Sequence, residues 1–526
     1  MIPSPKQIST PTPDIASNAS ISMFANMFYL VSRLILPPMI LAHVSLAEYG
    51  LWSACCVLLM YIGLTDAGFS NVYVRYTARY HAQGDTDSIN KLLSTGVLTL
   101  SAVALVLLCA IWFVIPHLLS LLNVSVDQQQ TATYLIMGTA TMYLLDISLG
   151  AYCYLLHGLQ RIREEKRIAI IGYILEPLLI LLFLQLGAGV YSLLFAFILR
   201  YCWSLSSFIR LAHQFIPELK VRFAFFDKTM LKLFLGFGTK VQLSALLGTF
   251  LFSLDRIIVG MMMGPKGIAL FELGTKLPVS ANSIPATISN VTYPAAARYL
   301  TQNDTDAVKR LYVQSSRAIC FLSGLPLAFM ALFSGAIIHV WLGNKDGIEQ
   351  VPTILALTAI WCHLHITTGP GTAVFRAMGH VGNEFFYHIL RLSCIAIAVL
   401  VSMQWLGVTL YALIIGLASG NATASISYLV HNQRRLALPL TSLLRDILLP
   451  GALAYPVAVV TQQLWSFVLP YQLTRGEMLF VILLIGALYT ALWFITAWQF
   501  MHTHERDWFL SKLARFSSLI PRGKKV

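Results

Sequence analysis

Apolar runs of about twenty residues follow one another along almost the whole chain, and they constrain the fold more than any other feature. A helix needs about 20 mostly apolar residues to cross a bilayer. Charged residues make up only 11% of the 526 residues, against about 25% in soluble domains. We therefore predict an all-α polytopic membrane protein with about 14 transmembrane helices, at residues 21–44, 49–72, 92–117, 131–157, 168–187, 189–211, 232–261, 265–293, 313–341, 351–374, 385–405, 407–430, 446–469 and 476–500.

Basic residues collect in every second loop between these runs. Arg75, Arg161, Lys220, Arg298 and Arg434 mark such loops. Because Lys and Arg are retained on the cytoplasmic side, this alternation supports an even number of spans with both termini in the cytoplasm. The net charge of +13 then predicts contact with anionic lipid head groups and not with nucleic acid.

One segment occurs twice at a constant offset of 219 residues. Nine identities link the two copies without a gap: Ser70-Asn71-Val72, Ala78-Arg79-Tyr80 and Asp85-Thr86-Asp87 match Ser289-Asn290-Val291, Ala297-Arg298-Tyr299 and Asp304-Thr305-Asp306. Six predicted spans separate the copies, so both face the cytoplasm. The halves are therefore expected to be parallel repeats, related by an axis along the membrane normal.

The repeat divides the chain into expected parts. These are a cytoplasmic tail (1–20), a six-helix lobe (21–212), an amphipathic linker (213–231), a second six-helix lobe (232–431), two additional transmembrane helices (432–500) and a basic cytoplasmic tail (501–526). The linker interleaves aromatic and basic residues and is expected to lie on the inner membrane surface.

Ionisable residues at bilayer depth are costly, and they either line a cavity or pair with each other. One interpretation is pairing: Glu272 with Lys276, Asp66 with Arg33, and Asp255 with a basic neighbour. The other is a polar cavity between the lobes with a slight cationic surplus, which suits an anionic ligand because Arg binds phosphate bidentately. His363 and His365 also lie in a predicted span, where packing is the commoner role for histidine.

Catalytic and cofactor motifs are not found in the sequence. It lacks a G-x-x-x-x-G-K-[ST] loop, a G-x-S-x-G elbow and an H-E-x-x-H pair. Its eight cysteines are scattered and are expected to be free thiols, with neither disulfides nor a metal site. We therefore expect no enzyme activity and no cofactor, and transport would be driven by an ion gradient, the membrane potential or the substrate gradient.

Several short motifs resemble those of the polysaccharide and O-antigen flippases of the multidrug/oligosaccharidyl-lipid/polysaccharide (MOP) exporter superfamily. They are Pro37-Pro38, Glu48-Tyr49-Gly50-Leu51-Trp52, Gly63-Leu64-Thr65-Asp66-Ala67-Gly68-Phe69, Arg75-Tyr76, Leu254-Asp255-Arg256, Ile257-Ile258-Val259-Gly260 with Gly264 and Gly274, and Ala377-Met378-Gly379-His380. Ala269-Leu270-Phe271 departs from the family's usual Gly-hydrophobic-Tyr. The resemblance covers nearly the whole chain and implies two lobes of six helices, as in multidrug exporters, plus two C-terminal helices.

The resemblance also implies a function: moving an undecaprenyl-diphosphate-linked oligosaccharide, such as an O-antigen or exopolysaccharide unit, across a bacterial inner membrane by alternating access. Depth and charge then select Arg33, Arg200, Lys240, Lys276 and Arg391 as phosphate or glycan contacts. Asp66, Glu176 and Glu272 are the expected gating or ion-coupling groups.

Two functions with the same fold stay open. A cation-coupled multidrug exporter would need a net acidic cavity and usually twelve spans, whereas a peptidoglycan-precursor flippase would share the fourteen spans and the cationic cavity. The expected partners are the lipid-linked oligosaccharide, membrane lipids and glycan polymerase or assembly proteins. The glycan, the coupling ion and the oligomeric state are not determined by the sequence.

Overall fold

The computed structural model is helical throughout the part of the chain that it describes. It describes residues 15–63, 69–380, 382–468, 473–500 and 506, and for residues 15–20, 22, 23, 236–253, 466–468 and 500 it describes the backbone alone. Within those ranges there is no β-strand. The all-α fold class predicted from the apolar runs is confirmed.

The chain divides into two compact units, Met1–Glu272 and Leu273–Val526. The helices of the first unit are α1 (Ile15–Leu41), α2 (Leu46–Ile62), α3 (Phe69–Ala82), α4 (Thr86–Leu121), α5 (Val126–Leu149), α6 (Ala151–Gly158), α7 (Ile162–Gln185) and α8 (Tyr191–Phe215), followed by the 3-10 turn η2 (Phe223–Phe225). The long helix α9 (Lys228–Ala281) kinks at Gly264, and the division between the units falls within it. The lobe boundaries expected from the sequence remain a prediction.

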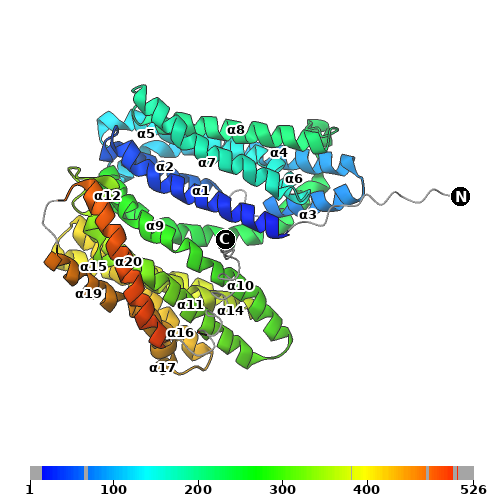
Figure 1. Cartoon of the computed structure of the whole chain (residues 1–526). Helices are drawn as coiled ribbons and strands as arrows, with labels where there is room; N and C mark the ends of the chain where they lie inside the picture. The colour runs from blue at the N-terminus through cyan, green and yellow to red at the C-terminus, as the bar shows by residue number, and fades with distance from the viewer. Residues whose placement is uncertain (1–14, 64–68, 381, 469–472, 501–505, 507–526) are drawn as a thin grey trace, which may run out of the picture. The chain divides into compact units, whose positions relative to one another are not determined.

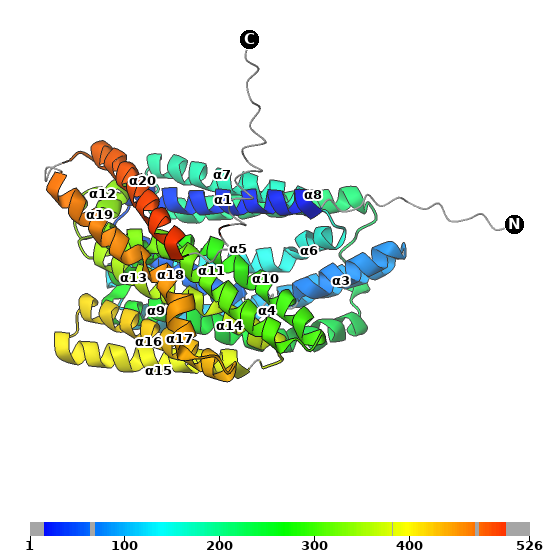
Figure 2. The same ribbon diagram turned by 60° about the horizontal axis from the view of Figure 1, so that its bottom comes forward.

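The second unit continues from α9 to the C-terminal helix. Its helices are α10 (Ser283–Thr301), α11 (Thr305–Leu332), α12 (Ser334–Leu342), α13 (Val351–Thr367), α14 (Gly369–Ala377), α15 (Gly382–Leu406), α16 (Leu410–Arg435), α17 (Leu440–Ser442), η3 (Leu443–Leu448), α18 (Leu449–Ala452), α19 (Ala454–Val468) and α20 (Arg475–Phe500). Figure 2 shows α15 and α16 lying side by side, and the two are in contact along their length.

Twelve helices in the described residues are long and apolar enough to cross a membrane, and α2 is a shorter apolar helix. Where the structure describes them, all fourteen predicted spans overlie helices. Several are interrupted: the span at 131–157 is divided between α5 and α6, and the span at 351–374 between α13 and α14. The chain is a multi-pass membrane protein, and fourteen is an approximate count of its spans.

The repeated segment forms the same turn in both units. In the first copy, α3 ends, Gly84 adopts a φ of 68°, and Asp85 caps α4 by accepting from the Ser88 amide. In the second copy, α10 ends, Asn303 adopts a φ of 56°, and Asp304 caps α11 by accepting from the Ala307 amide. The backbone angles of the two caps agree within about 2°, at φ −92° and ψ 81° for Asp85 and φ −91° and ψ 79° for Asp304. A short polar side chain at the N-cap supplies the acceptor that the first helical turn lacks.

The 219-residue offset extends well beyond the repeated sequence. Four helices of the first unit (α4, α6, α7 and α8) begin within one residue of the positions that the offset predicts from α11, α14, α15 and α16. The turn after α6 has Gln160 at a φ of 59°, and the turn after α14 has Gly379 at a φ of 78°. The duplication therefore includes at least α3–α8 and α10–α16, although only eighteen residues make it visible in the sequence.

Between the end of α8 and the start of α9 at Lys228, the linker forms only the short η2 turn. After α8 ends at Phe215, the chain runs along α4 to the η2 turn. Asn90 of α4 donates to the Glu218 carbonyl at 3.2 Å and accepts from the Lys220 amide at 2.8 Å. Ser94 accepts from the Arg222 amide at 3.2 Å. These α4 side chains satisfy backbone groups that a helix would have satisfied internally, so the linker belongs to the end of the first unit.

Candidate functional site

A buried cluster of two arginines and one glutamate lies in the first unit. It joins three helices that lie side by side in Figure 1, namely α1, α7 and α8. Arg33 of α1 places Nη1 3.1 Å from Oε1 of Glu176 and donates from Nη2 to Oε2 at 3.3 Å. Arg200 of α8 places Nε 3.4 Å from the same Oε2. Glu176 on α7 therefore faces two guanidinium groups with one carboxylate.

The burial of the cluster makes its charge balance important. The Glu176 side chain is 4% exposed, the Arg200 side chain 12% and the Arg33 side chain 27%. With both arginines protonated, the three groups carry a formal charge of +1. Buried charges are stable only where they are paired and hydrogen-bonded, so one further anion would balance the charge of this cluster.

Tyrosine rings line the cationic side of the cluster. The Arg33 guanidinium lies 5.2 Å from the Tyr29 ring centroid, and the Arg200 guanidinium lies 4.1 Å from that of Tyr201. Tyr29 in turn contacts Tyr173, with ring centroids 5.2 Å apart. The negative face of an aromatic ring stabilises a cation without neutralising it, so the rings hold the guanidinium groups while leaving their donors available. The sequence analysis did not identify these rings, although the adjacent residues Arg200 and Tyr201 could have indicated one of the contacts.

A second ion pair of the first unit bridges the kink in α9. Arg256 donates from Nε to Oε2 of Glu272 at 2.9 Å, and each side chain is 18% exposed. The two residues lie on opposite sides of Gly264, where φ is 66° and ψ −167°. The kink allows residues sixteen apart to meet, and Glu272 is paired across it with Arg256.

Arg391 belongs to a separate polar network within the second unit. It lies on α15, is 5% exposed, and donates from Nε to Oδ1 of Asn421 at 2.6 Å. Its guanidinium lies 5.8 Å from the ring centroid of Trp361. On the same helix, Tyr387 bonds through its hydroxyl to Nδ1 of His365 at 2.7 Å. The network ties α13, α15 and α16 together.

The remaining predicted site residues are placed as follows. Asp66 and the side chain of Lys240 lie outside the described residues, so the expected Arg33–Asp66 pair is not tested, although Glu176 is a partner of Arg33. Lys276 lies on α9 and is half-buried. His363 is a packing residue, 5% exposed, with Nε2 2.8 Å from the Cys320 carbonyl and Nδ1 3.1 Å from the Tyr455 hydroxyl. The structure thus joins Arg33, Glu176 and Arg200, while the binding and gating roles stay predictions.

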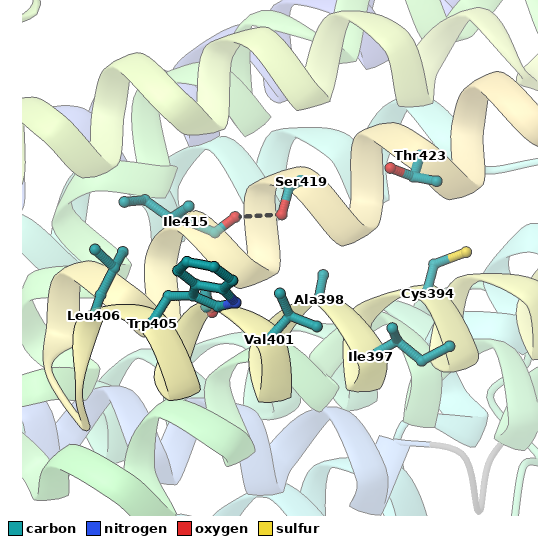
Figure 3. Close-up of a pocket in the computed structure, with 10 residues that line it drawn as sticks. Cys394, Ile397, Ala398, Val401, Trp405, Leu406, Ile415, Ser419 and Thr423 are labelled. Carbon is teal, nitrogen blue, oxygen red and sulfur yellow. Dashed lines mark hydrogen bonds between the residues drawn. The ribbon is translucent and has the colours of Figure 1, made fainter.

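An open groove of about 590 Å³ lies between α15 and α16 (Figure 3). It is lined by Cys394, Ile397, Ala398, Val401, Ser402, Trp405, Leu406, Ile415, Ser419 and Thr423. The Ser419 hydroxyl donates to the Ile415 carbonyl within its own helix at 2.7 Å. By the 219-residue offset, Ser419 and Ile395 are the counterparts of Arg200 and Glu176. No lining residue is charged, so the second unit lacks the cationic cluster at this place.

The fold and the buried charges define the class as a multi-pass helical membrane protein with the fold of MOP-superfamily transporters. A structure of the lipid II flippase MurJ in an inward closed conformation matches with a TM-score of 0.65 at 13% identity, covering 90% of this chain and 97% of that chain. An inward-facing multidrug resistance MATE family transporter of the MOP superfamily matches with a TM-score of 0.62 at 15% identity, covering 80% and 98%. The Vibrio cholerae MATE transporter VcmN matches with a TM-score of 0.53 at 15% identity, covering 80% and 98%.

The sequence comparison identifies the family. Residues 40–346, more than half of the chain, match the family model described as a polysaccharide biosynthesis protein. The chain therefore belongs to the polysaccharide biosynthesis protein family. Comparison with curated protein sequences finds no match. Family and fold agree with the resemblance that the sequence motifs indicated.

Proposed function

We propose that this protein is a flippase that moves a polyprenyl-diphosphate-linked oligosaccharide across the membrane by alternating access. The family supports a role in polysaccharide biosynthesis, and the fold is that of transporters. The observation that carries the proposal is the surplus of guanidinium over carboxylate in the cluster of Arg33, Glu176 and Arg200. A diphosphate is the anion that such a cluster is suited to bind.

The geometry suggests a role for each member of the cluster. Arg33 is the most exposed of the three, so it is the arginine that turns toward an arriving phosphate. Arg200 lies under the Tyr201 ring and stays in place as a fixed positive charge. Glu176 holds both arginines when no anion is bound, so substrate phosphate competes with a carboxylate. This exchange of one anion for another avoids leaving a buried cation uncompensated at any step.

The membrane orientation in this proposal follows the loop charges. Both termini and both copies of the repeated turn lie in the cytoplasm, and the membrane is a bacterial inner membrane. The lipid-linked substrate is the main partner, membrane lipids surround the helices, and glycan polymerase or assembly proteins receive the product. With no nucleotide-binding loop in the sequence, the energy comes from an ion gradient, the membrane potential or the substrate gradient.

Reconstituted vesicles provide the test. The purified chain in liposomes is given a polyprenyl-diphosphate oligosaccharide, and the fraction of glycan accessible to an external glycosidase is followed over time. Arg33→Ala and Arg200→Ala should each slow the transfer roughly ten- to hundredfold, the cost of losing a charge-assisted hydrogen bond. Arg210→Ala is the matched control, because Arg210 lies on α8 but is exposed. Equal transfer by all three variants would contradict the proposal.

The same vesicles distinguish the alternatives. A cation-coupled multidrug exporter would move an organic cation and leave the lipid-linked glycan in place. A peptidoglycan-precursor flippase would prefer a disaccharide–peptide on the same diphosphate carrier. The proposal expects the oligosaccharide without peptide to be moved fastest, and a clear preference for either other substrate would replace it.

A further inference from the structure

The turn between α6 and α7 brings together three side chains that none of the roles above uses. Cys153 and His157 lie one helical turn apart on α6, and Glu165 lies at the start of α7. Their ligand atoms, one from each residue, all lie within 4.8 Å of one another. We propose that Cys153, His157 and Glu165 bind a divalent metal ion, with Zn²⁺ as the ion of choice.

The distances fit a metal with little adjustment. His157 Nε2 lies 3.5 Å from Glu165 Oε2. Two ligands on a tetrahedral zinc ion, each about 2.0–2.2 Å from the metal, are separated by about 3.4 Å. Both atoms are buried, and Lys166 Nζ, 3.2 Å from Glu165 Oε2, is the other charged group at this carboxylate. In the tautomer that carries its proton on Nδ1, His157 Nε2 and Glu165 Oε2 would each offer a lone pair, and a cation between them would bind both.

The ligand set also selects the metal. A thiolate, an imidazole and a carboxylate form the mixed sulfur, nitrogen and oxygen set that zinc accepts, whereas magnesium and calcium prefer oxygen alone. Glu165 is 7% exposed and His157 side chain 29% exposed, so the site lies at the edge of the packed region with access from the loop. Three protein ligands leave the fourth position for water.

At the equivalent turn of the second unit, an arginine–glutamate ion pair takes the place of these three side chains. By the 219-residue offset, Cys153, His157 and Glu165 correspond to Thr372, Arg376 and Glu384. In the second unit, Arg376 Nη2 donates to Glu384 Oε1 and Oε2 at 2.8 and 2.7 Å and closes the turn between α14 and α15. In the first unit the acid is kept, the arginine is a histidine, and a thiol is added one turn earlier. A metal ion would therefore occupy the place of the guanidinium and hold α6 to α7.

Lys166 is the competing cation at this place. Its Nζ lies 3.2 Å from Glu165 Oε2, and its side chain is 27% exposed. Because the lysine is flexible and near the loop, it can turn toward water when a metal binds. The proposal revises the expectation of no metal site. That expectation rested on the scatter of the cysteines along the sequence and their positions in apolar runs, and it did not consider ligands from two helices.

The test uses the detergent-purified full chain after treatment with a chelator, with Co²⁺ and Zn²⁺ as probes. We expect about one Co²⁺ per chain, with a thiolate-to-cobalt absorption that Zn²⁺ removes. Cys153→Ser should abolish that absorption. It should also lower the affinity for the metal by more than about 100-fold, because loss of an outer-shell partner alone lowers it about 10- to 100-fold. Cys202→Ser is the matched control, because Cys202 is exposed on α8, and it should bind metal like the unaltered chain.

A second variant separates metal binding from simple loss of structure. His157→Arg copies the second unit, so it should keep the metal-free melting temperature, lose metal binding and show no rise in melting temperature with Zn²⁺. In the unaltered chain, Zn²⁺ should raise the melting temperature and slow alkylation of Cys153, followed by mass spectrometry of its peptide. The proposal is overturned if the unaltered chain binds no stoichiometric metal, if Cys153→Ser and His157→Arg bind as well as it does, or if Zn²⁺ leaves Cys153 alkylation unchanged.

Discussion

At the scale of single residues, we expect substitution of Glu176 to be strongly destabilising, because this one buried carboxylate is the ion-pair partner of two arginines. Removing one partner of a buried pair costs about 3–5 kcal/mol, since the remaining charge is left uncompensated. We expect Glu176→Gln to lower the free energy of unfolding by about this amount. Thermal unfolding in detergent, followed by intrinsic fluorescence, measures it.

Glu384→Gln is the matched control for this substitution. Glu384 is also paired with an arginine, but its side chain is 26% exposed and that of Arg376 is 52% exposed. Exposed ion pairs contribute about 0–1 kcal/mol, so this variant should be close to the unaltered chain. If both variants lose equal stability, the Arg33–Glu176–Arg200 cluster does not carry the buried charge that we assign to it.

The helix cap at Asp85 predicts a dependence of stability on pH. The Ser88 hydroxyl donates to Asp85 Oδ2 at 2.6 Å and the Ser88 amide donates to Oδ1 at 2.9 Å, and these bonds lower the pKa of the Asp85 carboxyl. A lowered folded-state pKa gives stability that is present above the unfolded value of about 3.9. That stability is lost as the pH falls through the folded-state pKa.

Asp85→Asn keeps a good capping residue but removes the titration. The difference in melting temperature between the unaltered chain and this variant should therefore shrink as the pH falls from about 7 to about 3. Ser88→Ala should reduce the pH dependence, because it removes the hydroxyl bond, which lowers the Asp85 pKa more than the amide bond does. Ala307 occupies the position equivalent to Ser88 in the second unit. There the backbone amide of Ala307 donates to Asp304, and no side-chain hydroxyl is present to donate as well. A difference that stays constant with pH would contradict this prediction.

At the scale of elements, the close approach of α2 to α9 requires a glycine at position 50. A Cβ atom at Gly50 of α2 would lie 1.8 Å from the carbonyl oxygen of Pro265 on α9, which is backbone and cannot turn aside. Gly50→Ala should therefore separate the two helices and lower the free energy of unfolding by about 3 kcal/mol. Gly486→Ala is the control, because its nearest atom would be 3.7 Å away and alanine is favoured in a helix by about 0.5–1 kcal/mol. Equal melting temperatures for the two variants would exclude close contact at Gly50.

Elements could be predicted from the sequence where a local pattern determines them. Apolar runs located the helices, and the repeated segment indicated the duplication. Partners could not be predicted where a kink or helix packing decides them. Glu272 was expected to pair with Lys276 at helical spacing, which stays a prediction. The kink at Gly264 brings Arg256 to Glu272 as a partner that the sequence did not indicate. Glu176 was recognised as buried and charged, but its two arginines come from helices that only the fold brings together.

The duplication is the clearest feature of the whole molecule, and the backbone preserves it over a longer stretch than the amino-acid sequence does. Backbone turns at Gly84 and Asn303, and at Gln160 and Gly379, recur at the same offset although most side chains between them differ. Turn geometry persists because a left-handed residue and an N-cap satisfy the ends of two helices at once. Charges diverge freely, so one unit holds the arginine cluster while its counterpart positions Ile395 and Ser419 are uncharged.

The duplication predicts the membrane topology. If the units are parallel repeats, equivalent turns lie on the same side of the membrane. Cysteines placed at Gly84 and Asn303, in a background without native cysteines, should be protected from a membrane-impermeant maleimide in right-side-out vesicles. Cysteines at Gly187 and Gly407, in the turns that end α7 and α15, should react, because a single membrane crossing separates each from the cytoplasmic side. All four positions have left-handed backbone in loops, so they are comparable in access. Reaction of Gly84→Cys but not Asn303→Cys would instead mean that the two units have opposite orientations in the membrane. The cytoplasmic assignment of the Gly84 turn would then fail, together with the even number of spans between the two turns.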